Sequence, residues 1–208
     1  MARKPSRRNA SPAAAVLTVL VLAALFVWRM LSPEDGKTQI TLPNGELHVW
    51  FLDVGQADSS LLVCDGQAML IDGGNVDDAS YVVASLEQYG VTSLDYVINT
   101  HCDEDHVGGL AGVLAKFPAA HVWSSTAEYD TKAFSNFVKY ANEQGRDIEI
   151  PSPGDTFLLG EAEITVLGPL RDYENNNENS IVLRVDYGET SFLFTGDMGI
   201  TAEDELVE

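Results

Sequence analysis

The first strand-like pattern of the chain begins at Leu47 and continues to Leu52. Two further apolar runs, residues 60–64 and 67–71, flank the pair Asp65-Gly66. Because Asp-Gly is a favoured two-residue hairpin turn, the pattern predicts that these two runs pair as antiparallel strands. The start of the domain is therefore expected to be a small sheet.

Apolar positions in the middle of the chain alternate between helical and strand spacing. Strands are predicted at 95–100 and 120–123, where apolar residues are continuous. Gly90 and Gly145 occupy positions where the C-terminal caps of helices belong. Three helices are predicted from side chains that share one face: Val82, Leu86 and Tyr89; Leu110, Val113, Leu114 and Phe117; and Phe134, Phe137, Val138 and Ala141.

The last third of the chain returns to strand patterns. Its four apolar runs are residues 156–159, 163–167, 181–185 and 192–194, with turns at 160–162 and 186–189. A polar loop rich in asparagine, residues 171–179, interrupts them. Strands, then alternating strands and helices, then strands again predict an α/β sandwich in which helices pack on mixed sheets.

An apolar leader precedes this domain. Residues 13–28 carry no charge and follow four cations, so we expect a membrane-spanning signal anchor over 13–31. The positive-inside rule then places residues 1–12 in the cytoplasm and exports a tether, 32–46, and the domain, 47–208. A cleaved signal peptide is the alternative, but the bulky Phe26, Trp28 and Met30 stand where a small-residue cleavage pattern belongs.

Charge narrows the range of partners. The chain has 12 Lys+Arg and 32 Asp+Glu, a net charge of −20, and residues 34–208 hold 7 cations against 32 anions, a net of −25. A surface this acidic repels phosphate backbones. The charge therefore excludes the class of proteins that coat nucleic acid. Two cysteines cannot form a disulfide framework, although one Cys64–Cys102 bond stays open in an exported domain.

The strongest chemical signal lies between a predicted strand and a predicted helix. His101, Asp103, Asp105 and His106 fall within six residues, and Gly108-Gly109 follows, leaving the ions uncrowded. Imidazoles and carboxylates suit zinc, manganese or iron, and the carboxyl end of a strand is where α/β sheets place their sites. The alternative is a solvated acidic turn that caps the next helix.

This segment resembles the second motif of the metallo-β-lactamase superfamily, whose usual form has histidine at the position of Asp103. Four other segments match the family in the correct order: residues 51–59, 70–74, 179–184 and 194–197. The set is similar in particular to the metallo-β-lactamase-like domain of ComEC-type DNA-uptake proteins and their stand-alone relatives. The resemblance covers Leu47 to the C-terminus and implies an αβ/βα sandwich, one or two metal ions at its edge, and hydrolytic activity.

The resemblance also implies a ligand set. His101 and Asp103 would hold one ion, Asp105 and His106 a second, and Asp197 would bridge the two. The ions would be divalent, zinc or manganese. Asp105 would in addition act in catalysis, by orienting the attacking hydroxide.

Supporting or substrate-facing positions follow from the same resemblance. Asp72 matches an acid that supports the ligand turn. The others lie on the first loop or the polar loop: Asp53, Gln56, Asp58, Asn179 and Ser180. The alternative is an ordinary structural turn for the aspartates and Gln56, and a solvated loop for Asn179 and Ser180. His48 and His121 begin strands; His48 is predicted to be a surface or rim histidine, and His121 to be structural.

The sequence departs from the family at two points. The family pattern continues past the bridging acid to a His-His-Gly-Ser turn, whereas this sequence ends at Glu208, and no histidine lies between His121 and Asp197. Each ion is therefore expected to have few protein ligands in its coordination shell. Either the domain lacks its C-terminal part through a truncated reading frame, or it is a degenerate relative that binds metal weakly.

The sequence leaves three functions open. The first is a membrane-anchored, extracytoplasmic metal-dependent hydrolase of phosphodiester or related ester bonds, acting on a small anionic ester or on nucleic acid. The second is a non-catalytic binding module that keeps the fold. The third is a di-iron redox enzyme, which should carry more histidines than this chain has.

Overall fold

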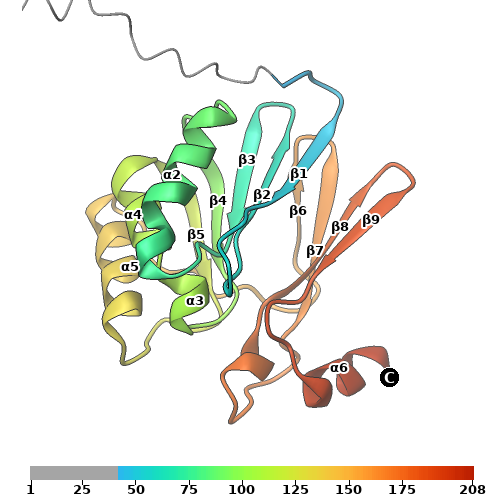
Figure 1. Cartoon of the computed structure of the whole chain (residues 1–208). Coiled ribbons are helices and arrows are strands. Elements are labelled where there is room, and N and C mark those ends of the chain that lie inside the picture. Colours follow the sequence, from blue (N-terminus) through green and yellow to red (C-terminus); the bar gives the residue numbers. More distant parts are fainter. Residues whose placement is uncertain (1–41) are drawn as a thin grey trace, which may run out of the picture. The chain divides into compact units, whose positions relative to one another are not determined.

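Two β-sheets form the framework of residues 42–208, the part of the chain that the computed structural model describes (Figure 1). The first sheet has the order β1-β2-β3-β4-β5 and the second the order β6-β7-β8-β9. The strands are β1 Leu47–Phe51, β2 Ser60–Cys64, β3 Gln67–Ile71, β4 Leu94–Asn99, β5 Ala119–Ser124, β6 Thr156–Leu159, β7 Ala162–Gly168, β8 Val182–Tyr187 and β9 Thr190–Phe194. The predicted α/β class is confirmed.

The first sheet is mixed, and its topology sets the position of the site. Strands β1 to β3 pair antiparallel, while β3, β4 and β5 run parallel. The predicted hairpin is present, with φ angles of 50° at Asp65 and 80° at Gly66. Because β3 and β4 are parallel, their carboxyl ends lie at one edge, where Asp72 follows β3 and Thr100 follows β4.

The second sheet is antiparallel throughout. Buried and partly or fully exposed residues alternate along β7, so one face of this sheet packs inward. The turn between β8 and β9 is shorter than the predicted 186–189, because main-chain pairing continues to Tyr187 and Thr190 and leaves only Gly188-Glu189 as the connection.

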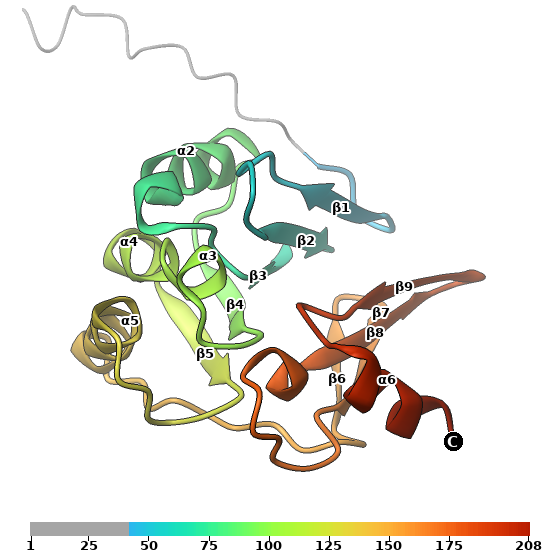
Figure 2. The same cartoon turned by 60° about the horizontal axis from the view of Figure 1, so that its bottom comes forward.

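Helices cover one face of the first sheet (Figures 1 and 2). They are α2 Ala79–Gln88, α4 Leu110–Lys116 and α5 Lys132–Glu143. Leu86, Leu110 and Phe137 from these helices pack with Leu70 and Val97 of the sheet in one core cluster. Each such side chain contributes roughly 1.5–3 kcal/mol when fully buried. The sheet thereby gains a rigid backing behind the edge that carries the site.

A second core cluster lies between the two sheets. Leu62, Met69 and Ile98 of the first sheet pack with Ile164 and Leu183 of the second, and all five side chains are fully buried. The two apolar faces of β2, β3 and β4 explain why these strands read as continuous rather than alternating apolar runs.

Two α-helices of residues 42–208 are not predicted by the apolar pattern. The first, α3 Glu104–Val107, is a single turn, too short to show a period. The second, α6 Ile200–Val207, begins where the Ala202 N–H donates to the Glu178 carboxylate at 2.8 Å. Glu178 belongs to the distant polar loop, so the signal that starts α6 is tertiary and absent from the local sequence.

The predicted leader lies outside the described residues. This applies to the cytoplasmic segment 1–12, to the anchor 13–31 and to most of the tether 32–46. Within residues 42–208, none of the helices combines the length and the apolar character that crossing a bilayer requires.

Candidate metal centre

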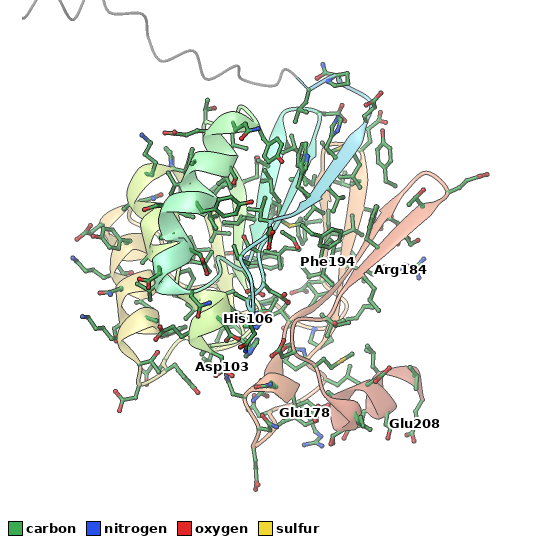
Figure 3. All side chains as sticks on the ribbon, in the orientation of Figure 1. Asp103, His106, Glu178, Arg184, Phe194 and Glu208 are labelled. Carbon is green, nitrogen blue, oxygen red and sulfur yellow. The ribbon has the colours of Figure 1, made fainter. Side chains whose placement is uncertain are left out.

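The predicted ligand cluster lies on the turn that leads from β4 into α3. His101 follows the end of β4 by two residues, Asp103 precedes α3, and Asp105 and His106 belong to that helix. Both imidazoles are buried, with exposures of 0% for His101 and 2% for His106, and their ring centroids are 4.1 Å apart. Figure 3 shows Asp103 and His106 together at the end of the first sheet. The turn thus brings both histidines to one place.

Main-chain hydrogen bonds hold this turn against the loop after β3. Gly73 N–H donates to the His106 carbonyl at 2.8 Å, and Gly109 N–H donates to the Gly74 carbonyl at 3.0 Å. A Cβ on Gly109 would lie 2.0 Å from the Gly73 oxygen. The neighbouring main chain therefore fills the space that a side chain at Gly109 would need. The prediction that this glycine keeps space free for ions is corrected accordingly.

Asp72 is the buried acceptor beneath the turn. Its side chain accepts hydrogen bonds from Thr100 N–H at 2.8 Å, from the Thr100 hydroxyl at 2.7 Å and from His106 Nδ1 at 2.8 Å. A carboxylate at this distance holds a proton on Nδ1, so the neutral form of His106, the form that binds a metal, has its lone pair on Nε2. Asp72 thus lies where a residue that supports a metal ligand must lie.

The orientation of His101 follows from the same chain of hydrogen bonds. The Thr100 hydroxyl gives its only proton to Asp72, so its oxygen accepts from His101 Nδ1, 3.2 Å away. The Ser180 hydroxyl donates to the Asn177 carbonyl at 2.7 Å, and its oxygen lies 3.4 Å from the same Nδ1. Both neighbours place the proton of His101 on Nδ1 and leave Nε2 as the lone-pair atom.

Nε2 of His101 is buried and has no hydrogen-bond partner within residues 42–208. It lies 3.6 Å from an oxygen of Asp103 and 4.0 Å from an oxygen of Asp197, while Nε2 of His106 lies 3.4 Å from the other Asp197 oxygen. A buried acceptor without a partner is costly, by about 1–3 kcal/mol. The donor set of two imidazoles and carboxylates therefore fits a divalent ion.

Within residues 42–208, two groups of three side chains are close enough to share an ion. One is His101, His106 and Asp197, and the other is Asp58, Asp72 and His106, with the ligand atoms of each group within 4.8 Å of one another. The carboxylates of Asp103 and Asp105 belong to neither group. Asp103 nevertheless faces His101, whereas no donor within residues 42–208 bonds to the carboxylate of Asp105.

The loop after β1 divides into residues that reach the site and residues that do not. Asp58 reaches it, because its N–H donates to the Asp105 carbonyl at 3.1 Å and its carboxylate faces His106. Asp53 and Gln56 are exposed, and within residues 42–208 neither side chain bonds to a ligand residue. The structure thus does not bring Asp53 or Gln56 into the centre, and both lie where a structural turn would put them.

The polar loop reaches the site with asparagines that the sequence does not single out. Asn176 Nδ2 donates to Asp103 at 2.7 Å, and Asn177 Nδ2 lies 3.4 Å from Asp197. Asn179, the predicted residue, instead bonds to both main-chain groups of Tyr173 at 2.8 Å and so holds its own loop. The run of asparagines signals the loop but cannot tell which amide turns inward.

Ser180 does reach the centre. Its hydroxyl oxygen accepts the N–H of Asp197 at 3.1 Å in addition to lying beside His101. Thr100, which the family motifs do not mark, also belongs to this hydrogen-bond network, because it bonds to Asp72 and contacts His101. The only sequence signal for Thr100 is its place next to His101.

Burial and the charges of the site shift the pKa values of three of its side chains. Burial opposes the protonated form of His106, but the hydrogen bond and charge of Asp72 outweigh burial and raise the pKa of His106 to about 9. Burial, with the charge of His106 adding to it, lowers the pKa of His101. Burial also raises the pKa of the Asp58 carboxyl, which Asp72 and Asp197 raise further and His106 opposes.

The remaining histidines contact residues away from the centre, and neither cysteine belongs to a ligand group of residues 42–208. His121 Nδ1 is 3.0 Å from Glu149, and His48 stacks on the Trp50 ring. Both cysteines are buried free thiols, so the Cys64–Cys102 bond left open by the sequence is not formed. Burial raises the pKa of the Cys102 thiol to about 11.

Comparison with known proteins identifies a family and several relatives. A family profile described as "Metallo-beta-lactamase superfamily" matches residues 52–208. The chain is 30% identical over 190 residues to "Competence protein ComA" of Neisseria gonorrhoeae, covering 91% of this chain and 24% of that protein. It is 25% identical over 206 residues to "ComE operon protein 3" of Bacillus subtilis (strain 168), covering 90% and 25%. The chain thus spans about a quarter of the length of these relatives.

Solved structures share the fold. Metallo-beta-lactamase SMB-1 bound to 2-mercaptoethanesulfonate superposes with a TM-score of 0.51 at 20% identity, covering 76% of this chain and 65% of that chain. A Cronobacter sakazakii metallo-beta-lactamase with a HARLDQ motif gives 0.50 at 20% identity, covering 70% and 60%. Identity this low shows the architecture alone. The matched family is the one that the five sequence motifs resemble.

Proposed function

The chain belongs to the metallo-beta-lactamase superfamily, and on that premise we propose that it is a metal-dependent hydrolase of phosphodiester or related ester bonds. One observation carries the proposal. His101 and His106 are both buried, both bind their Nδ1 proton to neighbouring oxygens, and both direct Nε2 toward Asp197. Such an arrangement suits a cation at the Nε2 atoms and has no purpose in a plain acidic turn.

Two ligand groups are proposed around the shared Asp197. His101 with Asp103 would hold one ion and His106 with Asp105 the other, and zinc or manganese suits these donors. When bound, such ions supply Lewis acidity and make water nucleophilic near neutral pH.

The residues around the ligands have orienting roles in this proposal. Asp72 keeps the Nδ1 proton on His106, and through Thr100 it does the same for His101. Asn176 fixes one oxygen of Asp103 by donating at 2.7 Å. Side chains held in this way keep ligand atoms in one geometry, so little ordering is needed when substrate arrives.

Asp105 is proposed to orient and deprotonate the attacking water. Its main chain is fixed, because its carbonyl accepts the Asp58 N–H at 3.1 Å. Within residues 42–208 no donor bonds to its carboxylate, so one oxygen would bind the ion and the other would accept a water proton. A carboxylate within hydrogen-bond reach of the water is the requirement for a general base.

The surface charge limits what the substrate can be. Residues 42–208 hold 30 acidic side chains against 6 Lys and Arg. An anionic ester can then bind through its reacting group at the ions, while a long nucleic acid meets repulsion elsewhere. A short phosphodiester is the substrate that these charges favour, and nucleic acid would be engaged at the cleaved bond rather than along its length.

The proposal includes a location. Residues 13–31 would anchor the chain in the cell membrane by a single span, and the domain would lie outside the cytoplasm. The support is the order of four cations, an uncharged apolar segment and an acidic domain.

A metal-binding module without turnover is the second candidate. It is favoured because His48 and His121, the other two histidines of the chain, contact residues away from the centre. Each ion would then have one imidazole, and carboxylates would supply the rest of its shell.

Hydrolysis of bis-p-nitrophenyl phosphate by the full chain, with zinc or manganese added, distinguishes the hydrolase from the binding module. We expect turnover that Asp197→Asn reduces by at least about 10²-fold, because that carboxylate faces both histidines. Asp147→Asn, on an exposed residue with no side-chain partner within residues 42–208, should leave turnover unchanged. Metal uptake without turnover would favour the binding module.

A further inference from the structure

The loop after β1 is fastened to the ligand turn. Asp58 N–H donates to the Asp105 carbonyl at 3.1 Å, and Gly74 N–H donates to the Asp58 carbonyl at 2.8 Å. Next to it, the Ser59 hydroxyl donates to the Asp72 carbonyl at 3.0 Å. These bonds fix the main chain of Asp58 on both sides, so the fold sets the direction of its Cα–Cβ bond.

The Asp58 carboxylate faces the imidazole of His106. One of its oxygens lies within 4.8 Å of ligand atoms of both His106 and Asp72. The two carboxylates differ in their partners: Asp72 accepts three hydrogen bonds, whereas no donor within residues 42–208 bonds to the side chain of Asp58. Within residues 42–208, Asp58 therefore has no donor on either oxygen beside His106, whose Nε2 lies 3.4 Å from an oxygen of Asp197.

The negative charges and one buried nitrogen atom of the centre fit a bound cation. His106 has Asp58, Asp72 and Asp197 around it, and no Lys or Arg of residues 42–208 forms an ion pair with any of these three. In the same centre, the Nε2 atom of His101 is fully buried without a hydrogen-bond partner among the described residues. Carboxylates gathered beside such an atom are stabilised by a metal ion.

We propose that Asp58 is a metal ligand, which completes the shell of the ion at His106. The oxygen of Asp58 adds a carboxylate ligand beside the imidazole of His106. This inference deepens the proposed function and rests on its metal centre, but it does not depend on hydrolytic turnover.

Cobalt substitution of an Asp58→Cys variant gives a direct test. A thiolate bonded to Co²⁺ produces a charge-transfer absorption in the near ultraviolet, whereas a thiol that is only nearby produces none. Asp53→Cys is the matched control, because Asp53 is exposed on the same loop. The two native cysteines are buried and common to both variants, so the wild-type chain supplies the baseline spectrum. We expect the absorption with Asp58→Cys alone.

Asp58→Asn provides a second measurement that does not require a new ligand. We expect its affinity for Co²⁺ at one ion to fall by at least about tenfold in a metal titration, with the same thermal unfolding midpoint as Asp53→Asn in the absence of metal. Unchanged affinity in Asp58→Asn, cobalt uptake by Asp58→Cys without the absorption, or no cobalt uptake by the wild-type chain would each overturn the inference.

Failure of the inference and failure of the proposed activity are distinguishable. A chain that cleaves bis-p-nitrophenyl phosphate but lacks the cobalt-thiolate absorption in Asp58→Cys is a hydrolase in which Asp58 is not a ligand. A chain that shows the absorption without cleavage keeps Asp58 as a ligand and refutes the hydrolase.

Discussion

Oδ2 of Asp72 lies 2.8 Å from Nδ1 of His106, and both side chains are buried. The same oxygen accepts the hydroxyl proton of Thr100, whose own oxygen accepts from His101. One carboxylate therefore determines on which nitrogen each histidine, in its neutral form, carries its proton. The parallel pairing of β3 with β4 makes this contact, because it brings the carboxyl ends of both strands to one edge.

Replacing Asp72 tests this arrangement. In Asp72→Asn the side chain keeps its size but loses its charge and one acceptor, so one of the three donors at that position is left without a partner. We expect metal affinity to fall by about 10–100-fold and the free energy of unfolding of the metal-free chain to fall by about 1–3 kcal/mol. Metal titration and chemical denaturation measure the two effects.

Asp77→Asn is the control for Asp72→Asn, because Asp77 follows the same strand and is exposed. We expect it to change neither quantity by more than about 0.5 kcal/mol. If Asp72→Asn bound metal as tightly as Asp77→Asn, Asp72 would serve the fold alone.

The state of the two cysteines gives a prediction that is independent of metal. Cys64 and Cys102 are free, with exposures of 0% and 1%, and burial raises the pKa of Cys102 to about 11. Because the thiolate is the reactive form, we expect iodoacetamide to modify neither residue in the folded chain at neutral pH and both in denaturant. Mass spectrometry counts the adducts. A chain that gains no adduct in denaturant without reductant would contain the disulfide.

Much of the first sheet and the ligand turn could be predicted from the sequence, because their signals are local. The hairpin around Asp65-Gly66 depends on adjacent residues, and the ligand cluster occupies six positions. Asn176 could not be predicted, because it meets Asp103 across 73 residues of chain. Its neighbours have the same side chain, and only the path of the folded loop decides which amide turns toward the metal centre.

The capping of α6 likewise depends on a contact between residues far apart in the sequence, and it can be tested. Glu178 has an exposure of 9% and accepts the Ala202 N–H, so Glu178→Ala leaves the start of this helix without its acceptor. We expect a loss of about 0.5–2 kcal/mol and faster amide hydrogen exchange confined to residues 200–207. Glu174→Ala, at an exposed position on the same loop, should change neither. Equal exchange in the two variants would contradict the cap.

The raised pKa of His106 predicts how metal affinity depends on pH. The pKa of about 9 lies above the ordinary value, so the metal-free chain keeps this proton at neutral pH, and the stability that the proton contributes is lost as pH rises through 9. A metal ion must displace the proton, so apparent affinity should rise about tenfold per pH unit and level off near that pKa. Calorimetry in two buffers of different ionisation enthalpy counts the proton released. Asp72→Asn removes the cause of the shift and should move the plateau to lower pH; a flat profile in the unmodified chain would show that His106 is already neutral.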